Sequence, residues 1–152
     1  MNLRAHEAYA TTQMQTSVAS ASPIDLVVMV YDRIFEHLKS AESALQAGRS
    51  ADEFIAKALE LISVGLQSCL IREQGCEIAD NLSALYDWAN RKILIGKLKK
   101  DPTVWIEVRQ VLYPLAEAWR TLAEERRESA VTQIVAAQGG RNLHTSTGSA
   151  FK

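Results

Sequence analysis

The chain has 152 residues, of which 47% are apolar and 23% charged, and its net charge is −1. This composition suits one globular domain and excludes a chain that is disordered over most of its length. The near-neutral charge gives no overall attraction to nucleic acid or to an anionic membrane, and no run of about 18 apolar residues predicts a membrane span. The first ten residues lack the apolar core of a secretory signal, so the protein is expected in the cytoplasm.

Helices are predicted along most of the chain, because apolar residues recur at helical spacing between well-placed glycines and prolines. The predicted helices cover residues 23–48, 51–73, 77–98 and 102–127. Ser22 with Asp25, and Ser50 with Glu53, have the spacing of capping boxes at the starts of the first two helices. No alternating apolar and polar run is bounded by turn residues, so no strand is predicted.

The fourth helix carries both a clear start and an interruption. Asp101-Pro102 provides a cap followed by a proline at the first helical position. Pro114 lies inside the helix and should kink it, because the carbonyl of Gln110 loses its hydrogen-bond donor. The apolar stripe of this helix contains Leu112, Leu115, Trp119 and Leu122, and we predict Trp119 to be a core residue.

The fold class predicted from these helices is all-α. Their similar lengths and short connections predict an antiparallel up-down-up-down four-helix bundle over residues 18–128. Residues 1–17 are expected to form a short, weakly helical segment, in which Leu3, Tyr9 and Met14 are isolated apolar anchors. Residues 129–152 are expected to be a flexible, largely disordered extension, because their last part is rich in Gly, Ser and Thr.

No catalytic, metal or cofactor site is predicted. His6, His37 and His144 lie in three separate segments, so they do not form the paired ligands of a metal-binding bundle. Cys69 and Cys76 are interpreted as reduced thiols rather than as a redox pair. The sequence contains no nucleophile motif or glycine-rich loop, although an enzyme whose site is assembled from distant residues remains an alternative.

Two regions of the predicted bundle have features that a simple core does not require. The first helix carries Leu26, Met29 and Val30 beyond its core stripe, which indicates either a groove for a partner helix or a surface covered by residues 3–16. The third helix has Tyr86 and Trp88 on either side of an aspartate, a combination that occurs in interfaces but also in ordinary cores.

Basic residues are concentrated at the end of the third helix. Five lie between Arg91 and Lys100 without any acidic residue among them. Most of them suit the negative end of a helix dipole, and a patch for an acidic partner is the alternative. Nucleic acid is the less favoured partner, and none is predicted.

Several short runs, in order along the chain, resemble the flagellar secretion chaperone family FliS. They are Ala8-Tyr9, Ala19 to Pro23, Leu26, Met29, Tyr31, Asp32, Glu77 to Ala79, Asn81 to Ser83, Leu85 to Asp87, Arg91, Ala118-Trp119 and Leu122. The resemblance covers about residues 8–122. It implies a helical bundle, which the spacing of apolar residues also predicts.

The resemblance further implies a non-enzymatic export chaperone that binds the disordered C-terminal segment of flagellin in the cytoplasm. Such a chaperone prevents premature polymerisation and delivers flagellin to the cytoplasmic side of the export gate. The candidate binding residues are Tyr9, Met14, Leu26, Met29, Val30, Asn81, Leu85, Tyr86, Trp88 and Arg91. Tyr9 and Met14 are predicted to act as a lid over part of this site.

Other partners and functions are considered beside this interpretation. A homodimer is one candidate assembly. The alternative function is a regulatory adaptor bundle that binds another folded protein through its basic residues. No cofactor and no insertion into a membrane are predicted.

Overall fold

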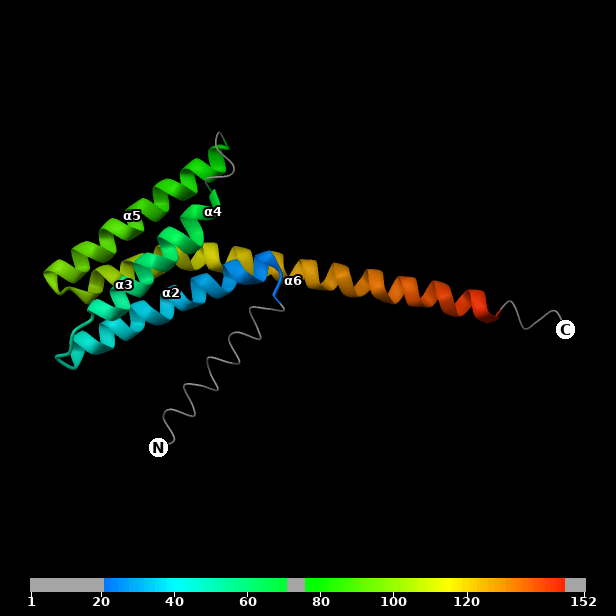
Figure 1. Cartoon of the computed structure of the whole chain (residues 1–152), viewed down its shortest axis with the longest axis horizontal. Helices are drawn as coiled ribbons and strands as arrows, with labels where there is room; N and C mark the ends of the chain where they lie inside the picture. The colour runs from blue at the N-terminus through cyan, green and yellow to red at the C-terminus, as the bar shows by residue number, and fades with distance from the viewer. Residues whose placement is uncertain (1–20, 71–75, 147–152) are drawn as a thin grey trace, which may run out of the picture.

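The computed structural model describes residues 21–70 and 76–146, with side chains up to residue 140. Within these ranges the chain is helical and contains no strand (Figure 1). Its elements are α2 (Pro23–Gln46), α3 (Asp52–Glu60), η1 (Leu61–Gln67), α4 (Ser68–Leu70), α5 (Glu77–Lys99) and α6 (Pro102–Ser146). The π-helix η1 joins α3 and α4 into one continuous rod, because the residues at both junctions keep right-handed helical backbone angles.

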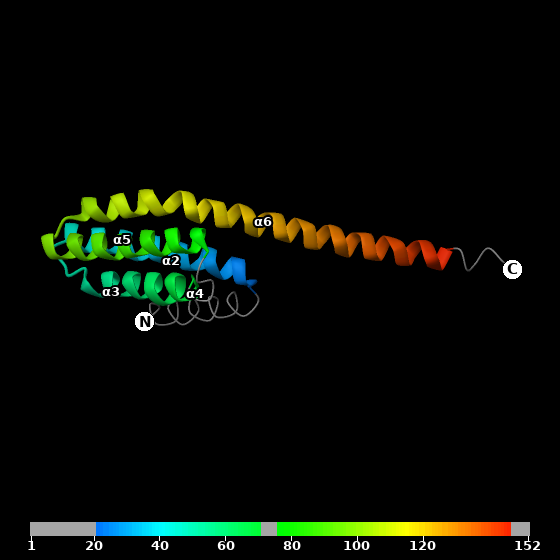
Figure 2. The same ribbon diagram turned by 90° about the horizontal axis from the view of Figure 1, so that it is seen from above.

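The elements form an antiparallel bundle, as the sequence predicts. Figure 2 shows α2, the rod from α3 to α4, α5 and the first half of α6 lying side by side with alternating directions. Helix α2 packs against α3 and α6, and α5 packs against α6 and the rod. Each helix therefore contacts its neighbours in sequence, and α6 closes the bundle by packing on α2.

Local hydrogen bonds explain two of the helix starts. At α2, the backbone N–H of Asp25 donates to the Ser22 hydroxyl at 3.2 Å, and the backbone N–H of Ser22 donates to the Asp25 carboxylate at 3.3 Å. This is the predicted capping box. At α6, the backbone N–H of Thr103 donates to the Asp101 carboxylate at 3.0 Å, and Pro102 is the first helical residue, as predicted.

The capping box predicted at the second helix does not form. Ala51, not Ser50, is the residue that precedes α3, and it has no side chain able to cap the helix. The Ser50 hydroxyl accepts only from the backbone N–H of Asp52, at 3.2 Å. Glu53 instead forms an ion pair with Lys57 at 3.0 Å. The turn is thus one residue longer than the spacing implied, and Gly48 within it adopts a positive φ of 70°.

Replacing Ser22 with alanine is expected to destabilise the protein by about 1 kcal/mol, because the first turn of α2 loses its side-chain acceptor. Chemical denaturation measures this loss. Ser50→Ala is the matched control, and it should have a smaller effect because Ser50 is not a cap. Equal losses for the two variants would contradict the assignment.

The core runs along the bundle axis and includes residues from every long helix. Its largest fully buried side chains are Trp105, Tyr31, Ile34, Leu38, Ile55, Ile62, Ile93, Leu112 and Val108. An interhelical ion pair between Arg109 and Glu42, at 2.6 Å, joins α6 to α2 at the edge of this core. A second joins Arg120 of α6 to Asp32 of α2 at 2.7 Å.

Trp119 is less buried than the predicted core position requires. Trp119 is half-buried and packs against the core from its edge, whereas Trp105 is the fully buried tryptophan of α6. The expected stripe was also misplaced at Leu122, which is exposed, while Ala116 and Ala123 are buried. The buried face of α6 is therefore rotated relative to the predicted one.

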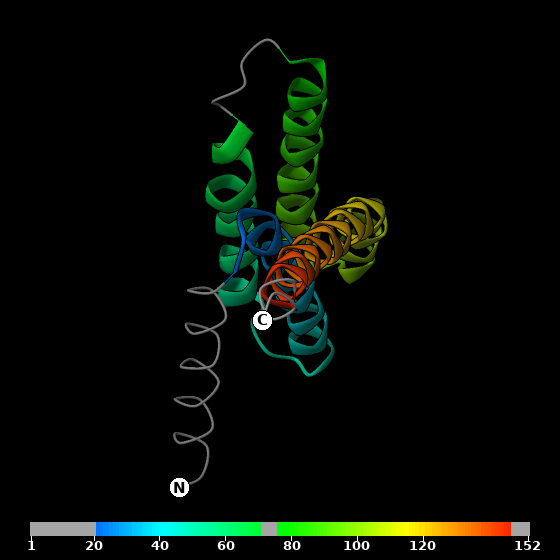
Figure 3. The ribbon, with the colours of Figure 1, turned by 90° about the vertical axis from the view of Figure 1, so that its right-hand side faces the viewer.

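Helix α6 is longer than predicted. It has 45 residues and spans about 68 Å, so that its second half projects beyond the bundle (Figure 1) and points toward the viewer in Figure 3. The prediction of a largely disordered extension is therefore wrong for residues 129–146, which are helical. The segment after Trp119 is rich in Ala, Glu, Arg and Gln, which favour helix strongly enough to include Gly139 and Gly140. The helix also continues through Pro114.

Some predictions fall outside the described ranges. These are the N-terminal segment 1–17 and the predicted end of the second helix near residue 73. No helix in the described part of the chain is long and apolar enough to cross a membrane.

Candidate functional site

An apolar groove lies between the first half of α2 and the π-helix η1. Its volume is about 490 Å³. We call it the α2–η1 groove; its lining residues are Pro23, Leu26, Val27, Met29, Val30, Arg33, Leu61, Gly65 and Cys69. Arg33 is the charged residue of this lining, and its guanidinium forms an ion pair with Glu36 at 2.8 Å. The groove is therefore suited to apolar side chains.

The sequence of α2 explains why this groove is apolar. The core of the bundle uses Ile24, Tyr31 and Ile34 on one side of the helix. Met29 and Val30 lie beside that stripe and are only half-buried, so apolar surface remains outside the core. A surface helix needs one apolar stripe, and the additional apolar residues here form a wall of the groove.

Gly65 allows η1 to lie close to α2. A Cβ atom at this position would be 3.0 Å from the Cγ1 atom of Val30, which is tighter than ordinary packing. The absence of a side chain thus permits the helices to approach, and it leaves backbone exposed at the floor of the groove. Glycine is a weak helix former, so its position in the middle of a helical rod has a packing reason.

The π-helix shapes the floor of the groove. At its end the backbone N–H of Ser68 donates to the carbonyl of Ser63, five residues earlier. The Ser68 hydroxyl donates to the carbonyl of Val64, and the Cys69 thiol donates to the carbonyl of Gly65 at 3.4 Å. The Ser68 and Cys69 side chains thus form hydrogen bonds with backbone carbonyls of the π-helix. Such π-turns are frequent at functional sites.

A second apolar cleft continues from the groove toward α5. Its volume is about 330 Å³, and we call it the α4–α5 cleft. Its lining residues are Val27, Gly65, Leu66, Cys69, Leu70, Cys76, Ile78, Ala79, Leu82, Tyr86 and Trp119. Val27, Gly65 and Cys69 line both hollows, so the two form one continuous apolar surface. Ile78, one of these lining residues, is 70% exposed.

The candidate residues of α2 are brought together, as predicted. Leu26, Met29 and Val30 all line the α2–η1 groove. Tyr86 lines the adjoining cleft but is buried, and its hydroxyl lies 2.5 Å from that of Tyr31. Tyr86 is therefore part of the wall, with its polar group already bonded within the core.

The remaining candidates of α5 do not line either hollow. Asn81 and Arg91 are exposed, whereas Leu85 and Trp88 are half-buried against the core. Tyr9 and Met14 lie outside the described residues. Sequence reasoning missed the other wall, formed by Leu61, Gly65 and Cys69. A lone glycine within a helical pattern was the signal that could have indicated it.

Burial raises the pKa of the Tyr31 phenol, and the hydrogen bond with Tyr86 raises it further. Burial likewise raises the pKa of Tyr86. Both phenols are therefore neutral in the folded bundle at any physiological pH.

Tyr31 and Tyr86 are expected to ionise only when the bundle unfolds in alkali. Because their folded pKa values are raised, their contribution to stability is complete below the unfolded pKa of about 10 and is lost as pH rises above it. A tyrosinate absorbance titration, compared with circular dichroism, tests this. Ionisation of all tyrosines in the folded protein would contradict the expectation.

Among the described residues, no group of three or more His, Cys, Asp or Glu side chains could hold a metal ion. Cys69 and Cys76 are free thiols at the surface. The groove that brings together Leu26, Met29 and Val30 is apolar, which suits the binding of an apolar segment.

Comparison with known proteins places this bundle in a family. The family described as "Flagellar protein FliS" matches residues 5–126, which include the groove and the adjoining cleft. The chain belongs to the FliS family. Among relatives named "Flagellar secretion chaperone FliS", that of Salmonella typhimurium is 37% identical over 119 residues, covering 77% of this chain and 88% of the relative.

Two further FliS relatives agree with this assignment. The Vibrio cholerae protein is 29% identical over 130 residues, covering 84% of this chain and 95% of the relative. The Escherichia coli protein is 31% identical over 116 residues, covering 75% of this chain and 85% of the relative. Membership of the family supports a chaperone role in flagellar export. The family match ends at residue 126, so it does not include the projecting half of α6.

Proposed function

We propose that the chain is a non-enzymatic chaperone that binds the disordered C-terminal segment of flagellin in the α2–η1 groove. Bound there, the segment cannot polymerise before secretion, and the complex delivers it in the cytoplasm to the export gate. The observation that carries this proposal is the continuous apolar surface of the groove and the α4–α5 cleft. Neither nucleic acid nor membrane insertion is part of the proposal.

The physical basis is coupled folding and binding. A disordered segment that folds on its partner buries roughly 1,000–3,000 Å² and loses about 2–5 kcal/mol to ordering. Apolar side chains at helical spacing on the segment would fill the groove beside Met29 and Val30. Such binding needs no nucleotide or metal, because release can accompany transfer to the export gate.

The test is a calorimetric titration with the C-terminal flagellin peptide of the same organism. We expect saturable binding with a negative heat-capacity change, because apolar surface is buried. Circular dichroism should show a gain of helix in the peptide. A scrambled peptide of the same composition is the control. Failure of the flagellin peptide to bind, together with binding of a folded partner, would favour the regulatory adaptor.

The N-terminal segment 1–17 is proposed as a lid on this groove, from the sequence alone. A tethered segment has an effective concentration of about the millimolar range, so Tyr9 and Met14 could compete with flagellin. Deleting residues 1–17 is expected to leave the bundle folded and to make flagellin binding equal or tighter. A melting curve and a titration of the truncated protein measure both effects. Lower stability combined with weaker binding would show instead that the segment belongs to the core.

A further inference from the structure

The solvent-facing side of α5 carries an apolar stripe near its C-terminal end. Leu94, Ile95 and Leu98 are 43%, 40% and 81% exposed. Together with Arg91 they occupy positions i, i+3, i+4 and i+7, so their side chains are neighbours on one face of the helix. Single exposed apolar residues are ordinary, but a contiguous group on one helix face indicates an interaction surface.

Basic residues flank this stripe. The segment from Arg91 to Lys100 contains five basic residues and no acidic one. Lys92 forms an ion pair with Glu107 at 3.7 Å, and Lys97 forms one with Asp52 at 3.6 Å. Among the described residues, no ion pair involves the other three. The helix dipole favours cations at the last turn of α5, but it gives no reason for leucines to be exposed there.

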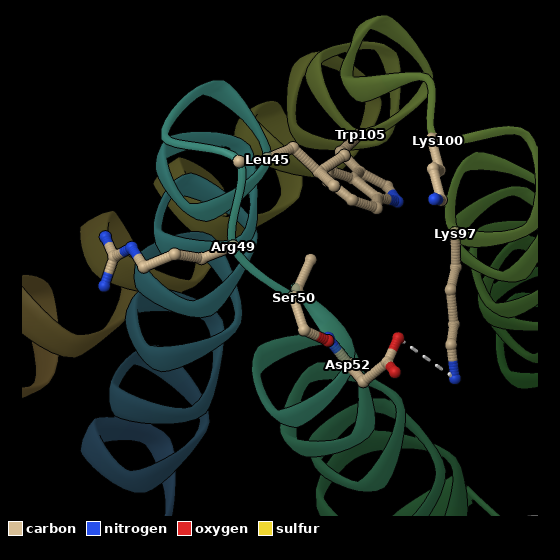
Figure 4. A pocket seen from close by; sticks show the side chains of 9 residues that line it. Leu45, Arg49, Ser50, Asp52, Lys97, Lys100 and Trp105 are labelled. Atoms are coloured by element: carbon tan, nitrogen blue, oxygen red, sulfur yellow. Dashed lines mark hydrogen bonds and ion pairs between the residues drawn. The ribbon is translucent and has the colours of Figure 1, made fainter.

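A cleft at the same end of the bundle is lined by two of these basic residues, Lys97 and Lys100. It has a volume of about 440 Å³ and lies between the α2–α3 turn and the α5–α6 turn. Figure 4 shows Lys97 and Lys100 on one side of the cleft and Ser50 and Asp52 on the other. Among the described residues, Asp52 is the one carboxylate that lines it. Figure 4 also shows Arg49 directed away from the cleft.

We propose that this end of the bundle docks an acidic amphipathic helix of another protein. We call the site the α5 docking surface; it consists of Arg91, Leu94, Ile95, Leu98, Lys99 and Lys100. The apolar side of the partner helix would pack on the apolar stripe, and its carboxylates would face Arg91, Lys99 and Lys100. Charge complementarity therefore selects an acidic helix over a basic one.

The α5 docking surface is separate from the groove. The groove lies beside the first half of α2 and η1. The α5 docking surface lies at the C-terminal end of α5, which is near the C-terminal end of α2 (Figure 2). A helix on α5 and a peptide in the groove can thus be bound at once. The inference does not depend on what occupies the groove.

The test uses a synthetic helical peptide with leucines at i, i+3, i+4 and i+7 flanked by glutamates, titrated into the full chain by fluorescence anisotropy. Its twin has lysine at each glutamate. The acidic peptide is expected to bind about tenfold or more tightly than the twin, and more weakly as salt rises. Leu98→Glu should abolish binding, and reversing both charges in Lys99→Glu/Lys100→Glu should invert the preference.

Several outcomes would overturn the inference. Equal binding of the two peptides would remove the charge argument. Loss of binding in Met29→Glu but not in Leu98→Glu would place the peptide in the groove. Binding of the chain to vesicles of anionic lipid, without binding to the acidic peptide, would assign the surface to a membrane. Because Leu98 is largely exposed, its variant should melt like the wild type, and a melting curve verifies this.

Discussion

Replacing Trp105 with alanine is expected to lower the free energy of unfolding by about 3–5 kcal/mol, because a large aromatic side chain leaves a cavity in the core. Trp105 has no exposed surface. Its indole N–H donates to the backbone carbonyl of Ile93 at 3.1 Å, which fixes α6 against α5. Denaturation with urea, with the slope compared between variants, measures the loss.

Trp119→Ala is the matched control for this experiment. Trp119 is half-buried at the edge of the core and lines the α4–α5 cleft, so its removal should cost clearly less stability. An equal or larger loss at Trp119 would restore the sequence prediction that it is the core tryptophan. The environment of Trp105 argues against that result. A Cβ at Gly96 would lie 2.6 Å from the indole nitrogen, so glycine is what allows the indole to pack there.

The sequence predicts the helices well because their starts depend on local interactions. A serine or aspartate cap and a proline at the first position act within three residues of one another, as at Ser22 and Asp101. The buried face of α6 is harder to predict from the sequence, because apolar residues occur on two overlapping faces of this helix. Trp105 and Ala116 define the buried face, while Leu122 lies on the other. Only contact with α2 and α5 decides between them.

The groove was predicted only on one side. The excess of apolar residues on α2 is visible in the sequence, since it exceeds what one core stripe requires. The opposing wall depends on the π-helix and on the approach of Gly65 to Val30, and both arise from tertiary packing. The candidates on α5 came partly from the pairing of Tyr86 with Trp88 and partly from resemblance, and neither says that they share a surface. Trp88 and Arg91 lie on parts of α5 that the groove does not reach.

A charge placed in the α2–η1 groove is expected to weaken binding of the flagellin segment by about a hundredfold. In Met29→Glu the bound peptide would bury an unpaired carboxylate, and a loss of about 2.7 kcal/mol corresponds to this factor. Calorimetric titration measures the change. Met29→Leu nearly conserves volume and polarity, so it should bind like the wild type. Val131→Glu adds the same charge at an exposed apolar position on the projecting part of α6 and should have no effect.

The pattern of losses distinguishes failure of the groove from failure of the function. Met29 is half-buried, so a melting curve of Met29→Glu accompanies the titration, and weaker binding is assigned to the groove when the variant is folded at the temperature of the titration. If Met29→Glu bound normally while Trp88→Ala and Arg91→Glu lost affinity, flagellin would bind the outer faces of α5 instead. The chaperone function would survive that result, but the groove would not be its site. If neither the wild type nor any variant bound the flagellin peptide detectably, the flagellin proposal itself would be wrong. We expect weaker binding of Met29→Glu, because the apolar lining across Val27, Gly65 and Cys69 is continuous and offers a peptide a single uninterrupted path.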